Sequence, residues 1–302
     1  MTTTTSNERR PLPRRILDEA RRSPGLAVTI VLLVLIALVG LLAPWIVPYP
    51  EDALGNTDTS RAYLEPSSDH WFGTDNLGRD VFSRVVYGTR FGLVVSVAVV
   101  CISLVIGIIV GLLAGYIGGW WDEGLMRVTD VFLAIPGLLL ALALASVLPP
   151  GLLGATIALS VTWWPWYTRI IRGEVLSVLG RKHVEACYAL GLSHPRILLR
   201  HVFPNARTSL MVQASTDFGS VLLAVAALSF LGLGAQSPTP DWGLMVEQSR
   251  THFSTHWWMG TFPGLAILVV AALFYLLGDG LRDRLDPKHT TGSTGSTGGE
   301  AK

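Results

Sequence analysis

The residues of this 302-residue chain that could do chemistry are few and widely spaced. His252 and His256 form the only histidine pair at i, i+4 spacing, and no third ligand lies near them in sequence, so we predict no metal site. The phosphate-binding pattern G-x-x-x-x-G-K-S/T does not occur, and no catalytic triad or pair of carboxylates falls on a common site. We therefore predict a protein that is not an enzyme and binds no cofactor itself.

The stretch with the most distinctive pattern spans residues 173–207, the most basic and least apolar part of the chain, which we call the elbow segment. Apolar residues recur near helical spacing over residues 184–190, and Gly191 stands where a left-handed residue would end that helix. Ser193 can cap a second helix, and Pro195 fits its first turn. The elbow segment thus predicts two short helices joined at a glycine, a surface suited to docking a soluble partner.

The chain as a whole is too apolar for a soluble domain. Half of its residues are hydrophobic, only 15% are charged, and the mean hydropathy is +0.47. A net charge of +1 gives no field that would attract nucleic acid. Cys101 and Cys187 fall on different sides of the expected topology, so we predict no disulfide. These properties predict an all-α, multi-pass membrane protein.

The apolar runs predict six transmembrane helices. A basic tail, residues 1–25, precedes a first span at 26–47, which is longer than a signal-peptide core and has its basic end in the cytoplasm. The acidic stretch 48–90 is expected outside and to end in an interfacial amphipathic helix near Val81. A core of five spans follows over residues 91–285, and 286–302 is a disordered tail.

Local signals divide this core further. Gly107, Gly111 and Gly115 form a ladder of small residues that favours close helix packing. Acidic residues from Asp122 to Asp130 fit a helix start, and the turn at 149–151 separates the third span from the fourth. The fifth and sixth spans are expected at 208–233 and 261–277, with an external loop at 235–261 between them. Four spans then precede the elbow segment, and its basic excess agrees with a cytoplasmic position, as do both basic termini.

Asp217 is the one acidic residue inside the fifth apolar run. Ionisable groups deep in a membrane face protein or a water-filled path, which makes Asp217 a candidate for a translocation path. If the helix begins later than Thr208, the carboxylate lies near the membrane interface instead. Both interpretations stay open at this point.

Three stretches resemble one family. Glu185-Ala186-Cys187, Gly191 and the run His201-Val202-Phe203-Pro204 have the spacing of the EAA motif of ABC-importer permeases, and they differ from it at Cys187, His201 and Phe203. The string H-W-F-G-T-D-x-L-G-R-D at 70–80 is similar to the N-terminal signature of the dipeptide/oligopeptide/nickel branch, as is the stretch 228–243. The resemblance covers nearly all of residues 66–285.

The resemblance implies a subunit of a larger machine in the bacterial plasma membrane. This chain would pair with a second, related permease to enclose the pore, above two cytoplasmic ABC ATPase subunits or domains that use ATP and Mg, while an extracytoplasmic solute-binding protein delivers the substrate. The two helices of the elbow segment would be the coupling helices that sit in a cleft of the ATPase. The coupling residues implied are Arg181, Lys182, Glu185, Ala186, Cys187, Gly191, His194, Pro195 and Pro204.

The substrate and two other classes of function stay open. Di- or oligopeptides are the leading expectation, with nickel, glutathione or another small solute as alternatives. A transporter driven by an ion gradient is indicated only by Asp217 and Asp130, and the sequence lacks the internal repeat that such transporters usually have. A membrane scaffold would explain the elbow segment as a generic docking site.

Overall fold

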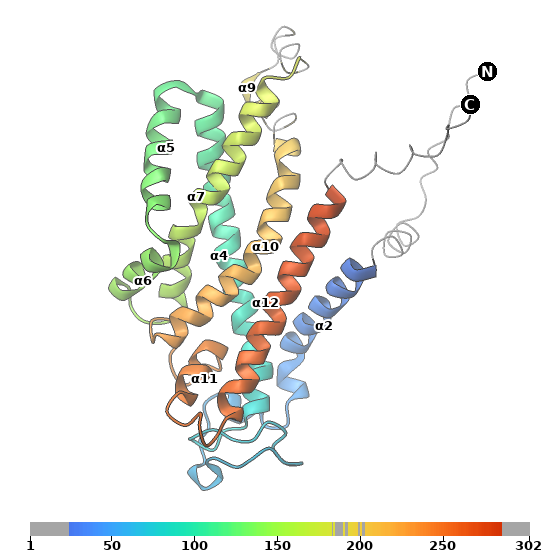
Figure 1. Cartoon of the computed structure of the whole chain (residues 1–302), viewed down its shortest axis with the longest axis vertical. Coiled ribbons are helices and arrows are strands. Elements are labelled where there is room, and N and C mark those ends of the chain that lie inside the picture. The colour runs from blue at the N-terminus through green and yellow to red at the C-terminus, as the bar shows by residue number, and fades with distance from the viewer. Residues whose placement is uncertain are drawn as a thin grey trace, which may run out of the picture.

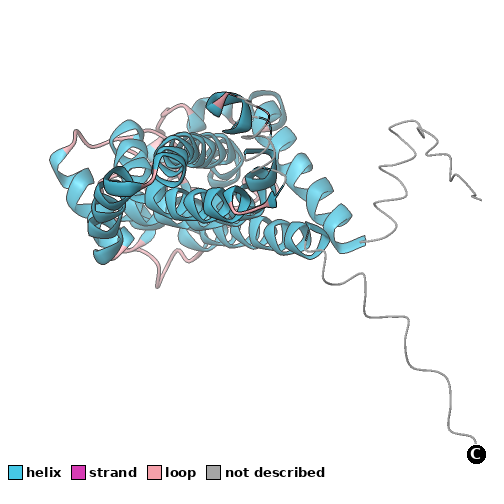
Figure 2. Ribbon diagram, turned by 90° about the horizontal axis from the view of Figure 1, so that it is seen from above, coloured by secondary structure: helices cyan, strands magenta, loops and turns pink. Residues whose placement is uncertain are grey.

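The chain forms a bundle of helices in a computed structural model that describes residues 24–182 and 203–285, together with residues 184, 190, 193–198 and 200 between them. Within these residues the backbone forms helices and loops but no strand (Figure 2). The long helices are α2 (Pro24–Ile46), α4 (Val81–Ile117), α7 (Leu152–Leu179), α10 (Phe203–Phe230) and α12 (Trp258–Leu285). The shorter ones are α3 (Pro50–Ala53), η1 (Thr59–Arg61), α5 (Gly119–Ala134), α6 (Gly137–Val147), α9 (His194–Ile197) and α11 (Trp242–Ser249).

The bundle has two distinct ends. Figure 1 shows α9 at one end, which we call the elbow end, while α3, η1 and α11 lie at the other, which we call the α11 end. The first turn of α2 and the last turn of α12 both point toward the elbow end (Figure 1). The described helices therefore run alternately between the two ends, as expected for a multi-pass membrane protein.

Length and composition identify the helices that can cross a membrane. Four described helices pass this test, namely 24–46, 81–117, 209–230 and 258–284. A fifth candidate is the pair formed by α5 and α6, which is bent by 90° at its break. The helix α7 is not among these candidates; its apolar first half leads into an aromatic cluster at 163–167, which the charged residues Arg169, Arg172 and Glu174 follow. The described residues thus support four candidate spans, or five if the bent pair is one span, and the six spans counted from the sequence, of which α7 would be one, stay a prediction.

Two helix boundaries differ from those that the sequence predicts. The helix α4 begins at Val81, so residues 81–90 are the first turns of a 37-residue helix and not a separate helix on the membrane surface. Asp80 caps α4, because its Oδ2 accepts a hydrogen bond from the amide of Ser83 at 2.7 Å. The apolar side chains of these turns are buried by the rest of the chain, which a hydropathy pattern alone does not reveal. Similarly, α12 begins at Trp258, three residues before the expected start of the sixth span.

The third predicted span is not one continuous helix but is broken at residues 135–136. The helix α5 ends at Ala134, and α6 restarts after Pro136, which has no amide hydrogen to continue the ladder. Ala141 and Ala145 then bury α6 against the core cluster that also contains Ala155 and Ala158 of α7. The turn predicted at 149–151 is confirmed, since it connects the end of α6 to the start of α7.

The glycine ladder brings α4 and α7 into close contact. A Cβ atom added to Gly111 would lie 2.7 Å from the carbonyl oxygen of Thr168 and 2.8 Å from Cβ of Ile171, and one added to Gly115 would lie 2.9 Å from Cβ of Val175. The backbones could not approach so closely with a side chain between them. The prediction that this ladder serves helix packing is confirmed, with both helices in the same subunit.

We expect Gly111→Leu to destabilise the bundle strongly. The new side chain must push against the backbone of α7, and overpacking of this kind costs about 1–3 kcal/mol even where side chains can adjust. The measurement is the thermal midpoint of the detergent-purified protein and its yield as a single species. Gly124→Leu on α5 is the matched control, because nothing lies within 4 Å of a Cβ there. Equal stability of the two variants would contradict this account.

Candidate functional site

The elbow segment continues directly from α7. The helix ends at Leu179, and the amide of Gly180 still donates to the carbonyl of Leu176 at 3.4 Å. Arg181 and Lys182, two of the predicted coupling residues, follow with exposed side chains at the elbow end. They are placed where a soluble partner can reach them.

The other predicted coupling residues are placed only in part. His194 and Pro195 open the short helix α9, as the sequence predicts. Pro204 lies in the first turn of α10, a position where a missing amide hydrogen is tolerated. The remaining four lie outside the described residues, so their coupling roles stay predictions: Glu185, Ala186, Cys187 and Gly191.

Two apolar residues that lie between α7 and α10 in the sequence pack against both helices. Val184 and Ile197 are fully buried, in one cluster with Val178 of α7 and Leu210 of α10. A displacement of the elbow segment would therefore act directly on both helices. These contacts connect the elbow segment mechanically to the bundle.

Polar contacts join α7 to α10 below this cluster. The hydroxyl of Ser209 donates to Oε1 of Glu174 at 2.6 Å. Deeper in the bundle, Asp217 is only 7% exposed, and its Oδ1 accepts a hydrogen bond from Gln213 at 2.9 Å. Because α10 begins at Phe203, Asp217 lies within the apolar span 209–230 and not near its start.

One oxygen of Asp217 has no hydrogen-bond partner among the described residues. This atom is Oδ2, and the hydroxyl of Tyr167 on α7 is likewise buried and without such a partner. The two groups lie close enough to interact electrostatically. In this structure the carboxylate thus faces α7 within the subunit rather than an open surface.

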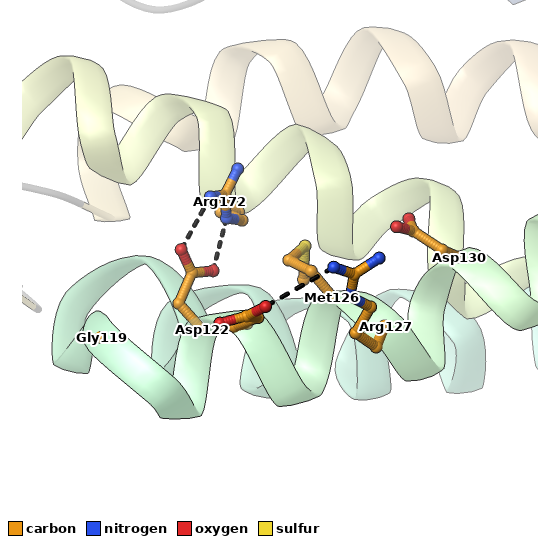
Figure 3. Close-up of a pocket in the computed structure, with 7 residues that line it drawn as sticks. Gly119, Asp122, Met126, Arg127, Asp130 and Arg172 are labelled. Atoms are coloured by element: carbon orange, nitrogen blue, oxygen red, sulfur yellow. Dashed lines mark hydrogen bonds and ion pairs between the residues drawn. The ribbon is translucent and has the colours of Figure 1, made fainter.

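Ion pairs join α7 to α5 on its other side. Arg172 of α7 donates from Nε and Nη2 to the two carboxylate oxygens of Asp122, at 2.6 and 2.7 Å (Figure 3). Arg169, which lies one turn farther from the elbow end than Arg172, donates to Oδ1 of Asp130 at 2.5 Å. Within α5 itself, Arg127 pairs with Glu123 at 3.5 Å.

These charges surround an open cavity of about 300 Å³. Figure 3 shows Asp122, Met126 and Arg127 of α5 below Arg172 of α7, which together form much of its wall. Each of its charged residues is engaged in an ion pair. The arrangement joins two helices and shows no chemistry of its own.

The α11 end contains a buried cluster of charges from the string at residues 70–80 and the start of α4. Asp75 accepts from Nε of Arg79 at 2.7 Å and from Nη1 of Arg84 at 2.5 Å, with all three side chains 5% exposed or less. Gln248 of α11 accepts from Nη2 of Arg79 at 3.3 Å. The cluster therefore joins the loop before α4 to α11, which lies far later in the chain.

A second set of contacts ties α3 to the same cluster. Nδ1 of His70 lies 2.9 Å from Oδ1 of Asp80, and the amide of Asp80 donates to Oδ2 of Asp52 at 2.9 Å. Burial raises the pKa of Asp52 above its ordinary value, and the hydrogen bond from Asp80 opposes this shift. Sequence reasoning used this string only as a family signature. The alternation of acidic and basic residues at 75, 79, 80 and 84 was the available signal for a buried ion cluster.

The histidine pair belongs to an aromatic cluster at the α11 end. Nε2 of His252 lies 3.3 Å from the hydroxyl of Tyr63, and the ring of His256 lies 4.3 Å from the Tyr63 ring, centre to centre. Across the described residues, no group of three histidine, cysteine or acidic side chains could hold a metal ion.

The comparisons with known proteins agree with these features. Residues 107–291 match the family model described as "Binding-protein-dependent transport system inner membrane component". The chain is 41% identical over 266 residues to the probable D,D-dipeptide transport system permease protein DdpC of Escherichia coli K12, a match that covers 88% of each chain. It is 38% identical to the dipeptide transport system permease protein DppC of Alkalihalophilus pseudofirmus, over 91% of this chain and 90% of that one.

Two further matches complete the comparison. The glutathione transport system permease protein GsiD of Escherichia coli O157:H7 is 43% identical over 268 residues, or 88% of each chain. An inward-facing structure of the MetNI methionine ABC transporter superposes with a TM-score of 0.55, over 68% of this chain and 97% of that one, and its 20% identity makes this a likeness of fold. The chain therefore belongs to the family of binding-protein-dependent transport system inner membrane components, the permease subunits of ABC importers.

Proposed function

We propose that this chain forms half of the pore of an ATP-driven importer for di- or oligopeptides. The observation that carries the proposal is the set of relatives at about 40% identity along most of their length, which are named for D,D-dipeptides, dipeptides and glutathione. All three substrates are short peptides or peptide-like molecules. Nickel, which the sequence resemblance left open, has no such support.

The assembly we propose has five functional parts. A second, related permease completes the pore, two cytoplasmic ATPase subunits or domains bind ATP and Mg, and an extracytoplasmic solute-binding protein delivers the peptide. In this arrangement six spans place the elbow end and both termini in the cytoplasm and the α11 end outside. The alternating direction of the long helices, with the start of α2 and the end of α12 directed toward the end that carries α9, supports that topology (Figure 1).

The mechanism follows from how the elbow segment is attached. ATP binding brings the two ATPases together and displaces the elbow segment, which presses on α7 and α10 through Val184 and Ile197. The two helices then move, and the pore changes from inward-facing to outward-facing. The contact with the ATPase is assigned to Arg181, Lys182 and Glu185, and the rigid turn to Gly191.

Co-purification tests the assembly. The tagged chain, expressed with its native neighbours and extracted in mild detergent, is expected to bring with it a second permease and ATPases that hydrolyse ATP. Reconstituted with the binding protein, the complex should take up a labelled dipeptide only when ATP is present. A folded chain that elutes alone and transports in response to a proton gradient would instead support an ion-driven transporter, and one that does neither would support a scaffold.

We predict a separate result for Asp217 if its carboxylate enters the translocation path during the cycle. A carboxylate there would contact the amino terminus of a peptide, so Asp217→Asn should raise the peptide concentration for half-maximal uptake about tenfold, the size expected for loss of a charged hydrogen bond. Asp283→Asn, at the exposed end of α12, is the control. An unchanged half-saturation would restrict Asp217 to the contact between α10 and α7.

A further inference from the structure

The helix α5 is attached to its own subunit in an unusual way. Thr129 is its one buried residue, and its apolar side chains largely point outward, with Val128 51% and Val131 64% exposed. Apolar packing between α5 and α7 is therefore limited, with the ring of Phe132 on α5 meeting that of Trp164 on α7 edge-on at 5.3 Å between centroids. The polar contacts that join the two helices are the ion pairs of Arg172 with Asp122 and of Arg169 with Asp130.

The stronger of these pairs lies close to the elbow segment. Arg172 directly precedes the elbow segment, whose first seven residues form the last turns of α7. Its guanidinium faces Asp122 with two parallel hydrogen bonds, and the two side chains are only 33% and 18% exposed (Figure 3). Paired, bidentate contacts of this kind fix direction as well as distance. The second pair, at Asp130, is half exposed and adds a further point of attachment.

We propose that these pairs, which we call the α5–α7 clamp, transmit the movement of the elbow segment to the bent α5–α6 element. The inference rests on the proposed function. When α7 moves with the elbow segment, the clamp pulls α5 along with it. The far end of α5 meets α6 at the 90° break before Pro136, while α6 is fixed in the core by Ala141 and Ala145. Movement of α5 therefore changes the bend between the two helices, and Asp122 and Arg172 are positioning residues for transport.

Charge exchange tests the clamp in the complete complex with its partner subunits. Asp122→Arg and Arg172→Asp are each expected to lower peptide uptake per ATP hydrolysed by at least about fivefold, the lower limit of typical coupling between sites. The double exchange recreates the pair with reversed charges and should restore that ratio to within about twofold of the wild type. Asp122→Asn and Arg172→Gln, which add no repulsion, provide milder variants in case the charge reversals do not fold.

The chain contains a matched control for this experiment. Glu123 and Arg127 form an ion pair of the same type beside the clamp, but both belong to α5 and are more than 70% exposed. Glu123→Arg and Arg127→Glu, singly or together, should leave uptake per ATP unchanged. A similar loss in these variants would show a general effect of charge at this surface and would overturn the clamp.

The outcomes separate the clamp from the proposed function. A wild-type complex without ATP-dependent peptide uptake would overturn the proposed function, and the role of the clamp in it. An active wild type in which Asp122→Asn and Arg172→Gln couple normally would overturn the clamp alone. A loss in both single exchanges with recovery in the double exchange supports it, because a merely structural role for either residue does not predict recovery.

Discussion

Replacing Asp75 by alanine is expected to prevent the permease from accumulating as a folded membrane protein. Asp75 is the shared partner of Arg79 and Arg84, whose side chains are each only 1% exposed. Its removal leaves both guanidinium groups buried with their main counter-charge missing. Breaking a buried ion pair in this way costs about 3–5 kcal/mol, a large part of the roughly 5–15 kcal/mol that stabilises a folded domain.

The measurement is the amount of the variant that inserts and elutes as a single species, with its thermal midpoint. Asp75→Asn keeps the shape and one acceptor oxygen and should be intermediate. Asp69→Ala, six residues earlier on the exposed surface of the same loop, is expected to behave like the wild type. Wild-type yield and stability of Asp75→Ala would mean that the cluster contributes little to the fold.

Gly191→Val is expected to abolish peptide uptake while ATP hydrolysis continues. The sequence places Gly191 at the left-handed end of the first coupling helix, and a β-branched residue resists that conformation. The penalty is at least about 1–2 kcal/mol for an L-residue, enough to misplace the second helix in most molecules. The predicted loss of uptake is therefore about tenfold or more in protein that inserts normally.

The readout is labelled-peptide uptake and ATP hydrolysis by the same reconstituted complex. Gly180→Val is the control: Gly180 has φ −75°, which any residue can adopt, and no atom lies closer than 3.8 Å to an added Cβ. We expect that variant to transport. Normal uptake in correctly inserted Gly191→Val would remove the left-handed turn from the mechanism.

Features set by local chemistry could be predicted from the sequence. The close packing at the small residues 107, 111 and 115 and the turn at 149–151 both follow from residue type and spacing, and the structure confirms them. Ser193 directly precedes α9, as its predicted capping role requires, whereas the sequence leaves two positions open for Asp217.

Features that depend on distant parts of the chain could not be predicted. Residues 81–90 read as a surface helix because a hydropathy pattern does not show that α11 and the preceding loop cover them. The local sequence indicates only that Asp122 and Asp130 are acidic residues favoured at a helix start. Nothing in it identifies their partners, which are arginines 50 and 39 residues later, respectively. The cluster around Asp75 was missed for the same reason, and the elbow residues from Glu185 to Gly191 stay predictions.

The contacts at the α11 end also determine when the protein can finish folding. Gln248 follows Arg79 by 169 residues, the indole of Trp258 donates to the carbonyl of Thr74 from 184 residues away, and the ring of Phe262 stacks on Phe72 at 3.8 Å. At about 5–20 residues per second, a ribosome needs roughly 8 to 40 seconds between these partners. Throughout that interval Arg79 and Arg84 lack the contacts that α11 provides. The loop before α4 is thus synthesised early but reaches its final packing late. A chain that stops before α11 leaves this end of the bundle open to proteases.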